Sequence, residues 1–324
     1  MYPLKFEPIL KQTLWGGDKI IPFKHLNDTL ANVGESWEVS AVEGSESIVA
    51  NGADKGLTLP DMVRKYKEDL VGEANYARFG NKFPLLIKFI DAKQALSIQI
   101  HPDDEYALEN ENEYGKNEMW YVLDAEPGAY LYCGLSRASS KEEIEERIKN
   151  NTITEILNKI EVKKGDVVMV KAGTIHAIGA GIFICEIQQN SNCTYRMYDY
   201  DRRDKFGNPR ELHVKKALDV VDNHKYIKDN KTEVVIARNE HFTEERLVQC
   251  KYFEVYKYDV NDEAKITVDE ASFVSVLFIN GSGTIETDDY EKTMEFKAGD
   301  SFFVSAGLRS IIIKGQATMV VTRV

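Results

Sequence analysis

The stretch EVKKGDVVMVKAGTIH, residues 161–176, returns in degenerate form as EFKAGDSFFVSAGLRS, residues 295–310. The Gly-Asp pair at 165–166 recurs at 299–300, and each copy has the pattern of a strand, a tight turn, a second strand and a second turn. Turns of these kinds also recur by chance in all-β proteins, but a match over sixteen residues makes chance the poorer explanation. The repeat therefore predicts two related β units in one chain.

Short apolar runs rich in Val, Ile, Phe and Tyr dominate the sequence outside the repeat, with Gly and Asp between them. Such runs are typical of an antiparallel sandwich or barrel. The strands that we expect include 83–90, 95–100, 119–123, 129–133, 167–170 and 182–187. Helical spacing is confined to 59–70, 140–160 and 212–221. We predict an all-β, mainly antiparallel fold made of two cupin-like jelly-roll barrels with a few short helices.

The two barrels are expected to differ in size and in chemistry. Residues 1–238 are predicted to form a catalytic, metal-binding barrel with helical insertions, and residues 239–324 a smaller degenerate barrel. His176 ends the first copy of the repeat, whereas Ser310 takes its place in the second. No acidic residue resembling Glu118 precedes the nearby predicted strand 273–279. Only the first barrel is therefore predicted to hold a metal ion.

Composition places the chain among ordinary globular proteins, with 43% hydrophobic and 29% charged residues. No apolar run approaches the roughly 18 residues of a membrane-spanning helix, and the charged N-terminus does not resemble a secretion signal, so we expect a cytoplasmic protein. The 4 cysteines lack zinc-knuckle or redox spacing and are predicted to be reduced core thiols. A net charge of -12 argues against nucleic acid or an anionic membrane as a partner. Nothing in the sequence indicates an obligatory protein partner.

The segment LSIQIH, residues 96–101, separates two chemistries by simple alternation. In a strand, successive side chains face opposite sides, so the aliphatic residues share one face while Ser97, Gln99 and His101 share the other. Glu118 in GKNEMWYV and His176 supply residues of the same kind. The pattern predicts one wall of a polar site.

Gln99, His101, Glu118 and His176 could together surround one divalent ion. Two imidazoles, an amide oxygen and a single carboxylate suit zinc, and a neutral amide ligand fits a catalytic centre better than a closed structural one. Each residue alone has an ordinary alternative: a turn histidine beside proline, a hydrogen-bonded strand-start histidine, or a surface carboxylate. The combination favours the metal site.

Lys88 lies in the otherwise apolar run FPLLIKFIDA, where burying an unpaired ammonium group costs several kcal/mol. If this strand pairs beside 95–101, Lys88 and Ser97 could receive a phosphate together. A lysine on an edge strand that reaches water is the alternative.

Arg196 and Glu186 are charged residues among apolar neighbours. Arg196 could bind a phosphate or stabilise an enediolate oxygen, or it could simply pair with Asp199 or Asp201. Glu186 could be a buried general base with a raised pKa, or it could neutralise Lys88 or Lys116.

The strings FPLLIKFIDAKQALSIQIHPDD, GKNEMWY, KAGTIHAIG and TYRMYDYDR closely resemble type I mannose-6-phosphate isomerases, the zinc-dependent phosphomannose isomerases of the cupin superfamily. LKQTLWGG and GESWEVS resemble the shorter bacterial members. The resemblance covers the chain to about residue 220, and beyond residue 240 it rests on barrel-like patterning. The chain keeps only a short helical insertion at 140–160, where larger eukaryotic members carry an extra helical domain.

The resemblance implies reversible isomerisation of D-mannose 6-phosphate and D-fructose 6-phosphate through a cis-enediol, with one zinc ion per chain. It implies that the zinc ligands are Gln99, His101, Glu118 and His176, and that Arg196 is the catalytic arginine. It implies a phosphate and sugar pocket lined by Ser97, Lys88, Lys116 and Glu186. Trp15 resembles a pocket-lining aromatic residue of the family, although core packing is an equally good account of it. Glu186 is our first candidate for the general base and Lys116 our second. The alternatives are another metal-dependent cupin enzyme, either a sugar isomerase or an oxygenase, and a non-catalytic sugar-sensing cupin.

Overall fold

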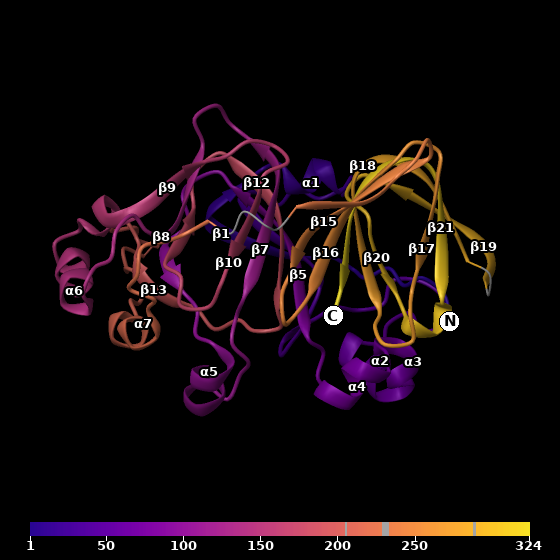
Figure 1. The fold of residues 1–324 in the computed structure, drawn as a ribbon, viewed down its shortest axis with the longest axis horizontal. Helices are drawn as coiled ribbons and strands as arrows, with labels where there is room; N and C mark the ends of the chain where they lie inside the picture. Colours follow the sequence, from indigo (N-terminus) through magenta and orange to yellow (C-terminus); the bar gives the residue numbers. More distant parts are fainter. Residues whose placement is uncertain (205, 229–232, 288–289) are drawn as a thin grey trace.

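The computed structural model describes residues 1–204, 206–228, 233–287 and 290–324, and these fold mainly into antiparallel strands arranged in two units side by side (Figure 1). The predicted all-β fold is confirmed. The 4 cysteines are free thiols, as predicted, but only Cys133 and Cys185 are buried, whereas Cys193 and Cys250 are half-buried. No helix in the described ranges has the length and apolar content that a membrane crossing requires.

The first unit contains two sheets that enclose an apolar core. The six-stranded sheet has the order β1 (Ile9–Gly17), β2 (Val33–Val39), β5 (Leu85–Ala92), β12 (Ile182–Gln189), β7 (Glu118–Ala125) and β10 (Val167–Val170). The five-stranded sheet has the order β13 (Tyr195–Tyr198), β6 (Ile98–Ile100), β11 (His176–Ile178), β8 (Tyr130–Leu135) and β9 (Leu157–Glu161). A small ribbon joins β3 (Ala41–Val42) to β4 (Ser45–Glu46).

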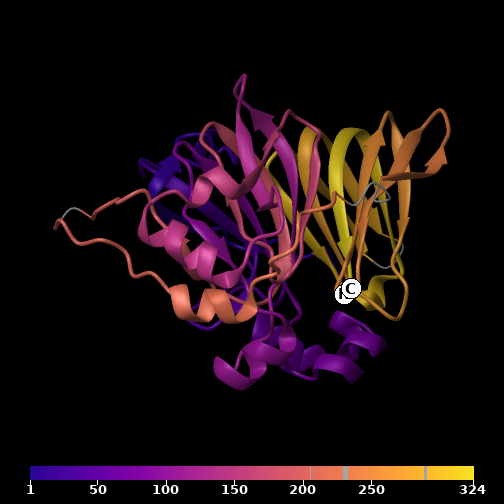
Figure 2. The same cartoon turned by 60° about the vertical axis from the view of Figure 1, so that its left-hand side comes forward.

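The second unit is one eight-stranded sheet wrapped around its own apolar core (Figure 2). Its main path runs β14 (Val234–Arg238), β15 (Phe242–Gln249), β16 (Glu254–Val260), β21 (Ser310–Arg323), β18 (Val274–Thr287) and β19 (Tyr290–Lys297). Off this path, β17 (Glu263–Thr267) pairs with β21 and β20 (Ser301–Val304) pairs with β18.

The central strands of the six-stranded sheet are buried on both faces. Every residue of β5 and of β12 is buried. Because side chains alternate along a strand, Ile87 and Phe89 belong to a core shared with the second unit, whereas Ile90 belongs to the core between the two sheets. The shared core includes Phe83, whose ring centroid lies 5.9 Å from that of Phe303 in a tilted arrangement. The second unit therefore covers the outer face of the sheet whose inner face meets the opposite sheet.

The helices are short and lie outside the sheets. They are α1 (Ile20–Phe23), α2 (Leu59–Tyr66), α3 (Glu68–Val71), α4 (Glu73–Phe79), α5 (Asp104–Asn110), α6 (Lys141–Lys149) and α7 (Val214–Val220), with 3-10 turns η1 (Ile153–Ile156) and η2 (Ala306–Leu308). Figure 1 shows α2, α3 and α4 gathered below the second unit, and α6 and α7 at the far end of the first.

The predicted helical segments are present but subdivided. Thr58 begins α2 with a capping box, and Lys67, at a φ of 49°, separates α2 from α3 within the expected 59–70 helix. The expected 140–160 helix is α6 followed by η1 and then β9. The sequence analysis did not identify α4 or α5, because each is a single short segment of seven residues that offers little helical periodicity.

The internal repeat has the same backbone geometry in both units. Gly165 and Gly299 have φ values of 92° and 85°, a left-handed conformation that glycine adopts without strain. The Gly165 amide donates to the Val122 carbonyl at 2.8 Å, and the Gly299 amide donates to the Phe278 carbonyl at 2.8 Å. The repeated sequence therefore specifies the same turn against the same neighbouring strand.

The register of the repeat explains why the two units differ in chemistry. Glu118 pairs with Val170 in the first unit, whereas Val274 pairs with Val304 at the corresponding place in the second. Val274 is fully buried. Among the described residues, the second unit thus has an aliphatic side chain where the first has its carboxylate.

Candidate metal centre and substrate pocket

Three strands of the first unit bring the predicted ligands together at one end of the inter-sheet space. Glu118 begins β7 in one sheet, while His176 begins β11 in the other and pairs directly with Gln99 of β6. His101 follows β6 by one residue. Residues that are distant in sequence therefore meet because the two sheets face each other.

The ligand atoms of His101, Glu118 and His176 all lie within 4.8 Å of one another. Glu118 Oε1 is 3.2 Å from His176 Nε2, and Glu118 Oε2 is 3.5 Å from His101 Nε2. The Gln99 amide lies 3.4 Å from His176 Nε2, and its oxygen and nitrogen exchange places by a simple flip. Gln99 can therefore offer its oxygen to the same centre.

Hydrogen bonds outside the cluster orient both imidazole rings. His101 Nδ1 lies 2.9 Å from the Cys193 carbonyl oxygen, and His176 Nδ1 lies 2.8 Å from the Thr174 carbonyl oxygen. A carbonyl accepts from Nδ1–H, so both Nε2 atoms point into the cluster as lone-pair donors.

Protonation and burial suit a cation at this centre. Burial, followed by the charge of Lys116, lowers the pKa of His101 to about 3, and burial also lowers the pKa of His176. Burial alone would raise the pKa of Glu118, but the charge of Lys116 and the neighbouring imidazoles hold it well below its usual range. His101 Nε2 and both Glu118 oxygens are buried without a hydrogen-bond partner among the described residues. Neutral imidazoles and an ionised carboxylate are the states in which these groups bind metal ions.

A cavity of about 300 Å³ adjoins the cluster. Its lining includes eight of the ten predicted site residues, namely Trp15, Lys88, Ser97, Gln99, Lys116, His176, Glu186 and Arg196. The other two, His101 and Glu118, belong to the ligand cluster beside it. The structure thus brings all ten together, while their individual roles stay predictions.

Lys88 is ion-paired rather than exposed at an edge. Its Nζ lies 3.1 Å from Glu186 Oε1 and 3.6 Å from Glu35 Oε2. The Trp120 indole N–H donates to Glu186 Oε2 at 2.9 Å. Burial, followed by the charge of Glu118, raises the pKa of Glu186. Glu186 therefore neutralises Lys88, which was one of the two predicted roles. Its pKa is also raised, as the predicted role of a buried general base requires.

The strand pairing assumed for Lys88 and Ser97 is wrong. β5 pairs with β1, β2 and β12, whereas β6 belongs to the facing sheet. The two side chains line the cavity from strands in opposite sheets. Alternation along each strand predicted which strand face carries Lys88 and which carries Ser97. The sheet to which each strand belongs depends on pairing between distant segments of the chain.

Arg196 makes neither of the two ion pairs considered for it. Its Nη1 donates to the Glu211 carbonyl at 2.9 Å, and its Nε is buried without a hydrogen-bond partner among the described residues. Asp199 instead binds Arg202 and Arg210, and Asp201 binds Arg203. Arg196 is therefore a cation at the cavity that makes no ion pair with a carboxylate among the described residues.

Glu35 and Arg210 also line the cavity, and the sequence analysis did not identify either. Glu35 alternates with buried neighbours in β2, a pattern that could have suggested an inward-facing carboxylate. Arg210 lies in GNPRELH, where no periodic pattern marks a direction for its side chain.

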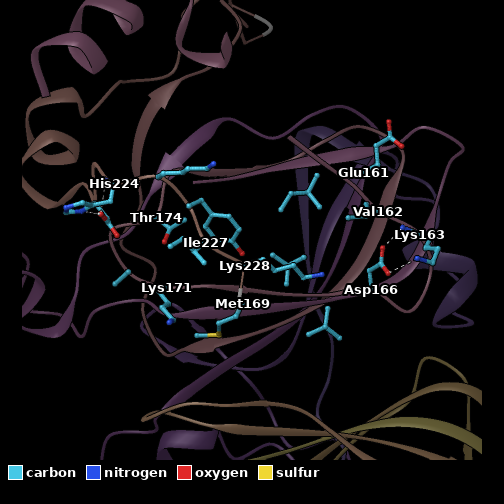
Figure 3. A pocket seen from close by; sticks show the side chains of 17 residues that line it. Glu161, Val162, Lys163, Asp166, Met169, Lys171, Thr174, His224, Ile227 and Lys228 are labelled. Carbon is cyan, nitrogen blue, oxygen red and sulfur yellow. Dashed lines mark hydrogen bonds and ion pairs between the residues drawn. The ribbon is translucent and has the colours of Figure 1, made fainter. Parts of the chain in front are cut away.

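A larger cavity of about 570 Å³ lies elsewhere, between β9, β10 and the segment 222–228 (Figure 3). Figure 3 shows Lys163, Lys171, His224 and Lys228 around it, together with the apolar Met169. None of the ten predicted residues lines it. Size alone does not mark the site, and the ligand cluster favours the smaller cavity.

Comparisons with known proteins show which family the chain resembles. A family model described as "Phosphomannose isomerase type I, catalytic domain" matches residues 4–129, and one described as "Mannose-6-phosphate isomerase, cupin domain" matches residues 243–324. The second match lies where the sequence resemblance rested on patterning alone.

Relatives match over most of the chain. Mannose-6-phosphate isomerase ManA of Bacillus subtilis (strain 168) is 36% identical over 331 residues, covering 99% of this chain and 98% of its own. A mannose-6-phosphate isomerase of Streptococcus mutans is 38% identical over 283 residues, covering 87% and 86%. The crystal structure of the mannose 6-phosphate isomerase from Bacillus subtilis superposes with a TM-score of 0.92 at 37% identity and covers 100% of both chains.

Proposed function

The chain belongs to the type I phosphomannose isomerase family, and we propose that it interconverts D-mannose 6-phosphate and D-fructose 6-phosphate in the cavity beside His101, Glu118 and His176. The observation that carries this proposal is the pairing of a buried ligand cluster with a cavity that contains a raised-pKa carboxylate and an arginine without a carboxylate partner of its own. This combination provides the groups that an aldose to ketose isomerisation requires.

The metal ion is proposed to be zinc, one per chain, held by Gln99, His101, Glu118 and His176. Two imidazole nitrogens with amide and carboxylate oxygens would fit a borderline cation such as zinc. When bound, the ion supplies Lewis acidity that orients and polarises sugar oxygens.

Proton transfer is assigned to the residues of the cavity wall. Glu186 would remove the proton from C2 of the open-chain aldose to give a cis-enediol, and the proton would return to C1 of the ketose. Its raised pKa brings its basicity closer to neutral pH, which favours reversible transfer. Lys116, whose Nζ lies 3.1 Å from Glu118 Oε2, is the second candidate. Arg196 would stabilise the oxygen charge that develops on the enediolate.

Substrate binding is assigned to Ser97, Lys88 and Trp15. Ser97 and Lys88 are donors that could reach the phosphate from opposite walls of the cavity, and Trp15 offers an aromatic face to the sugar. Lys88 already faces two carboxylates, so it brings a hydrogen bond but no net positive charge.

The division of labour follows the two units. Residues 1–238 are proposed as the catalytic domain and residues 239–324 as a smaller domain without a metal site, although β14 (Val234–Arg238) pairs with β15 and so belongs to the sheet of the second unit. Val274, at the position of Glu118, supports the absence of a second centre among the described residues. A cytoplasmic place in carbohydrate metabolism is proposed with the activity.

The shared activity of the relatives favours an isomerase over a cupin oxygenase. A sugar-sensing cupin would have no need of a base and an oxyanion-stabilising arginine at the same cavity. The test is a coupled assay that detects fructose 6-phosphate formed from mannose 6-phosphate, with and without a chelator. Chelator-sensitive conversion is expected, and a purified protein without such activity would contradict the proposal.

A further inference from the structure

The substrate's phosphate carries close to two negative charges at neutral pH, and both lysines at the cavity are already paired with carboxylates. Lys88 lies near both Glu186 and Glu35. Lys116 lies beside Glu118. A dianion in a partly buried site needs nearby net positive charge, because its own hydration is lost on binding.

Such charge is concentrated around Asp199. This carboxylate is 5% exposed and binds two guanidinium groups, so the group as a whole is positive. Arg210 donates from Nε to Asp199 Oδ2 at 2.7 Å and from Nη2 to Oδ1 at 2.5 Å. Arg202 donates from Nη2 to Asp199 Oδ1 at 2.5 Å. The two-point contact fixes the plane of Arg210 and leaves its Nη1 group free of any contact with Asp199.

The position of this group relative to the cavity is also fixed. Arg202 Nη1 donates to the Ala95 carbonyl at 2.5 Å, which ties the group to the chain two residues before Ser97. Arg210, Arg196 and Ser97 all line the same cavity. Two guanidinium groups and a hydroxyl donor thus lie on one side of the cavity, while Lys88 and Glu186 come from the facing sheet.

We propose that Arg210 binds the phosphate group of the sugar phosphate, with Ser97 beside it, and that Asp199 is a positioning residue that orients the Arg210 guanidinium. The inference rests on the proposed function, since it names the phosphate-binding residue of the same cavity. A guanidinium held by a carboxylate on one edge presents its remaining N–H groups in a fixed direction, which suits the geometry of a phosphate.

A purely structural role for Arg210 is the competing account. Asp199 with Arg202 and Arg210 closes the base of the loop that carries both arginines, and Figure 2 shows this loop reaching away from the first unit. If closing the loop were the only role, replacing Arg210 would change stability but would not selectively weaken phosphate binding.

The test uses the full-length, metal-loaded enzyme with Arg210→Gln, Arg210→Lys and the matched control Arg203→Gln. Arg203 lies in the same loop and pairs with the exposed Asp201, but it does not line the cavity. Arg210→Gln should raise KM for mannose 6-phosphate about ten- to a hundredfold, with a smaller change in kcat, because hydrogen bonds to charged groups contribute about 1.5–3 kcal/mol. Arg210→Lys should recover part of the loss, and Arg203→Gln should stay within about twofold of the parent enzyme.

A binding measurement separates this inference from the proposed function. Inorganic phosphate is titrated calorimetrically into the parent enzyme and the variants, and its affinity should fall in Arg210→Gln by the same factor as the rise in KM. Asp199→Asn should shift KM in the same direction by a smaller factor, because Arg210 keeps its charge but loses its orientation.

The outcomes are distinguishable. A parent protein that binds inorganic phosphate through Arg210 but does not isomerise the sugar would refute the proposed function alone. If the parent enzyme is active and Arg210→Gln has the same KM and the same phosphate affinity as the parent, the inference is overturned. Arg210 would then have only the structural role of closing the base of the loop. If Arg210→Gln does not fold, Arg210→Lys decides on the same two measurements, because it retains a cation at this position.

Discussion

Lys88 Nζ lies 3.1 Å from Glu186 Oε1, and the two residues are directly opposite each other in the pairing of β5 with β12. Both side chains face the cavity from strands that are buried on both faces. The pair lets a carboxylate lie in an apolar wall, because the ammonium group offsets part of the cost of burying it. Glu186 thus combines a raised pKa with a fixed position, which are the properties of a general base.

Glu186→Gln should lower kcat by about 10²-fold or more, since the amide keeps the shape and loses the base. The change is measured together with exchange of the C2 hydrogen in deuterated water, which should fall in parallel. Glu161→Gln, an exposed carboxylate in β9, is the control and should leave both quantities unchanged. Near-normal turnover in Glu186→Gln, with turnover abolished in Lys116→Met, would assign the base to Lys116 instead.

The pH dependence of kcat/KM should show an acid limb above pH 4.5, the usual pKa of a glutamate, because burial raises the pKa of Glu186. The base works only when ionised, so activity falls as the pH drops through this raised value. The Trp120 N–H stabilises the ionised form, and Trp120→Phe should therefore raise the pKa of Glu186 further and move the limb to higher pH. A limb that stays in place in Trp120→Phe would disconnect it from Glu186.

Removal of the metal ion should abolish activity and lower the thermal midpoint. The buried carboxylate of Glu118 and the imidazole of His101 lose the partner that satisfies them, and a ligand that binds only the folded state stabilises that state. Added zinc should restore both quantities. Glu118→Gln should hold less metal by elemental analysis, whereas Glu161→Gln should match the parent. Full metal content in Glu118→Gln would place the ion elsewhere.

Phe303→Ala should destabilise the whole chain, although Phe303 belongs to the second unit. The side chain is fully buried in the shared core and stacks on Phe273 at 4.9 Å. Its removal should cost about 3–5 kcal/mol of the free energy of unfolding, measured by denaturant titration. Ile227→Ala, at a position that is 84% exposed, should change the free energy of unfolding by less than about 0.5 kcal/mol.

The same experiment tests how the two units cooperate. Because they share one apolar core, thermal unfolding should be a single transition in the parent and in Phe303→Ala. Two thermal transitions, of which the substitution shifts only one, would show that the two units unfold separately and that the shared core does not couple them.

Much of the site was predictable because its pattern is local. Alternation within 96–101 placed Gln99 on the polar face, and the repeat indicated a turn before His176. The second copy of the repeat has Ser310 in place of the histidine, and no acidic residue resembling Glu118 precedes the strand 273–279, where the structure has Val274. The family resemblance added Trp15, which does line the cavity.

Arg210 was not predictable in the same way. Its direction depends on Asp199, which is eleven residues earlier, and on the loop between them that returns to the sheet. The pairing assumed for the strand of Lys88 failed for a related reason, since any apolar strand of the chain could have been its neighbour.

The sequence by itself determined the all-β class, the repeated turns and the face on which each candidate side chain lies, because these depend on residues a few positions apart. Only the tertiary structure decided that β5 and β6 belong to facing sheets, that Glu186 lies against Lys88, and that Arg210 reaches the cavity. Strand pairing and ion pairing join segments about a hundred residues apart, and they are selected by burial and charge balance over the whole fold.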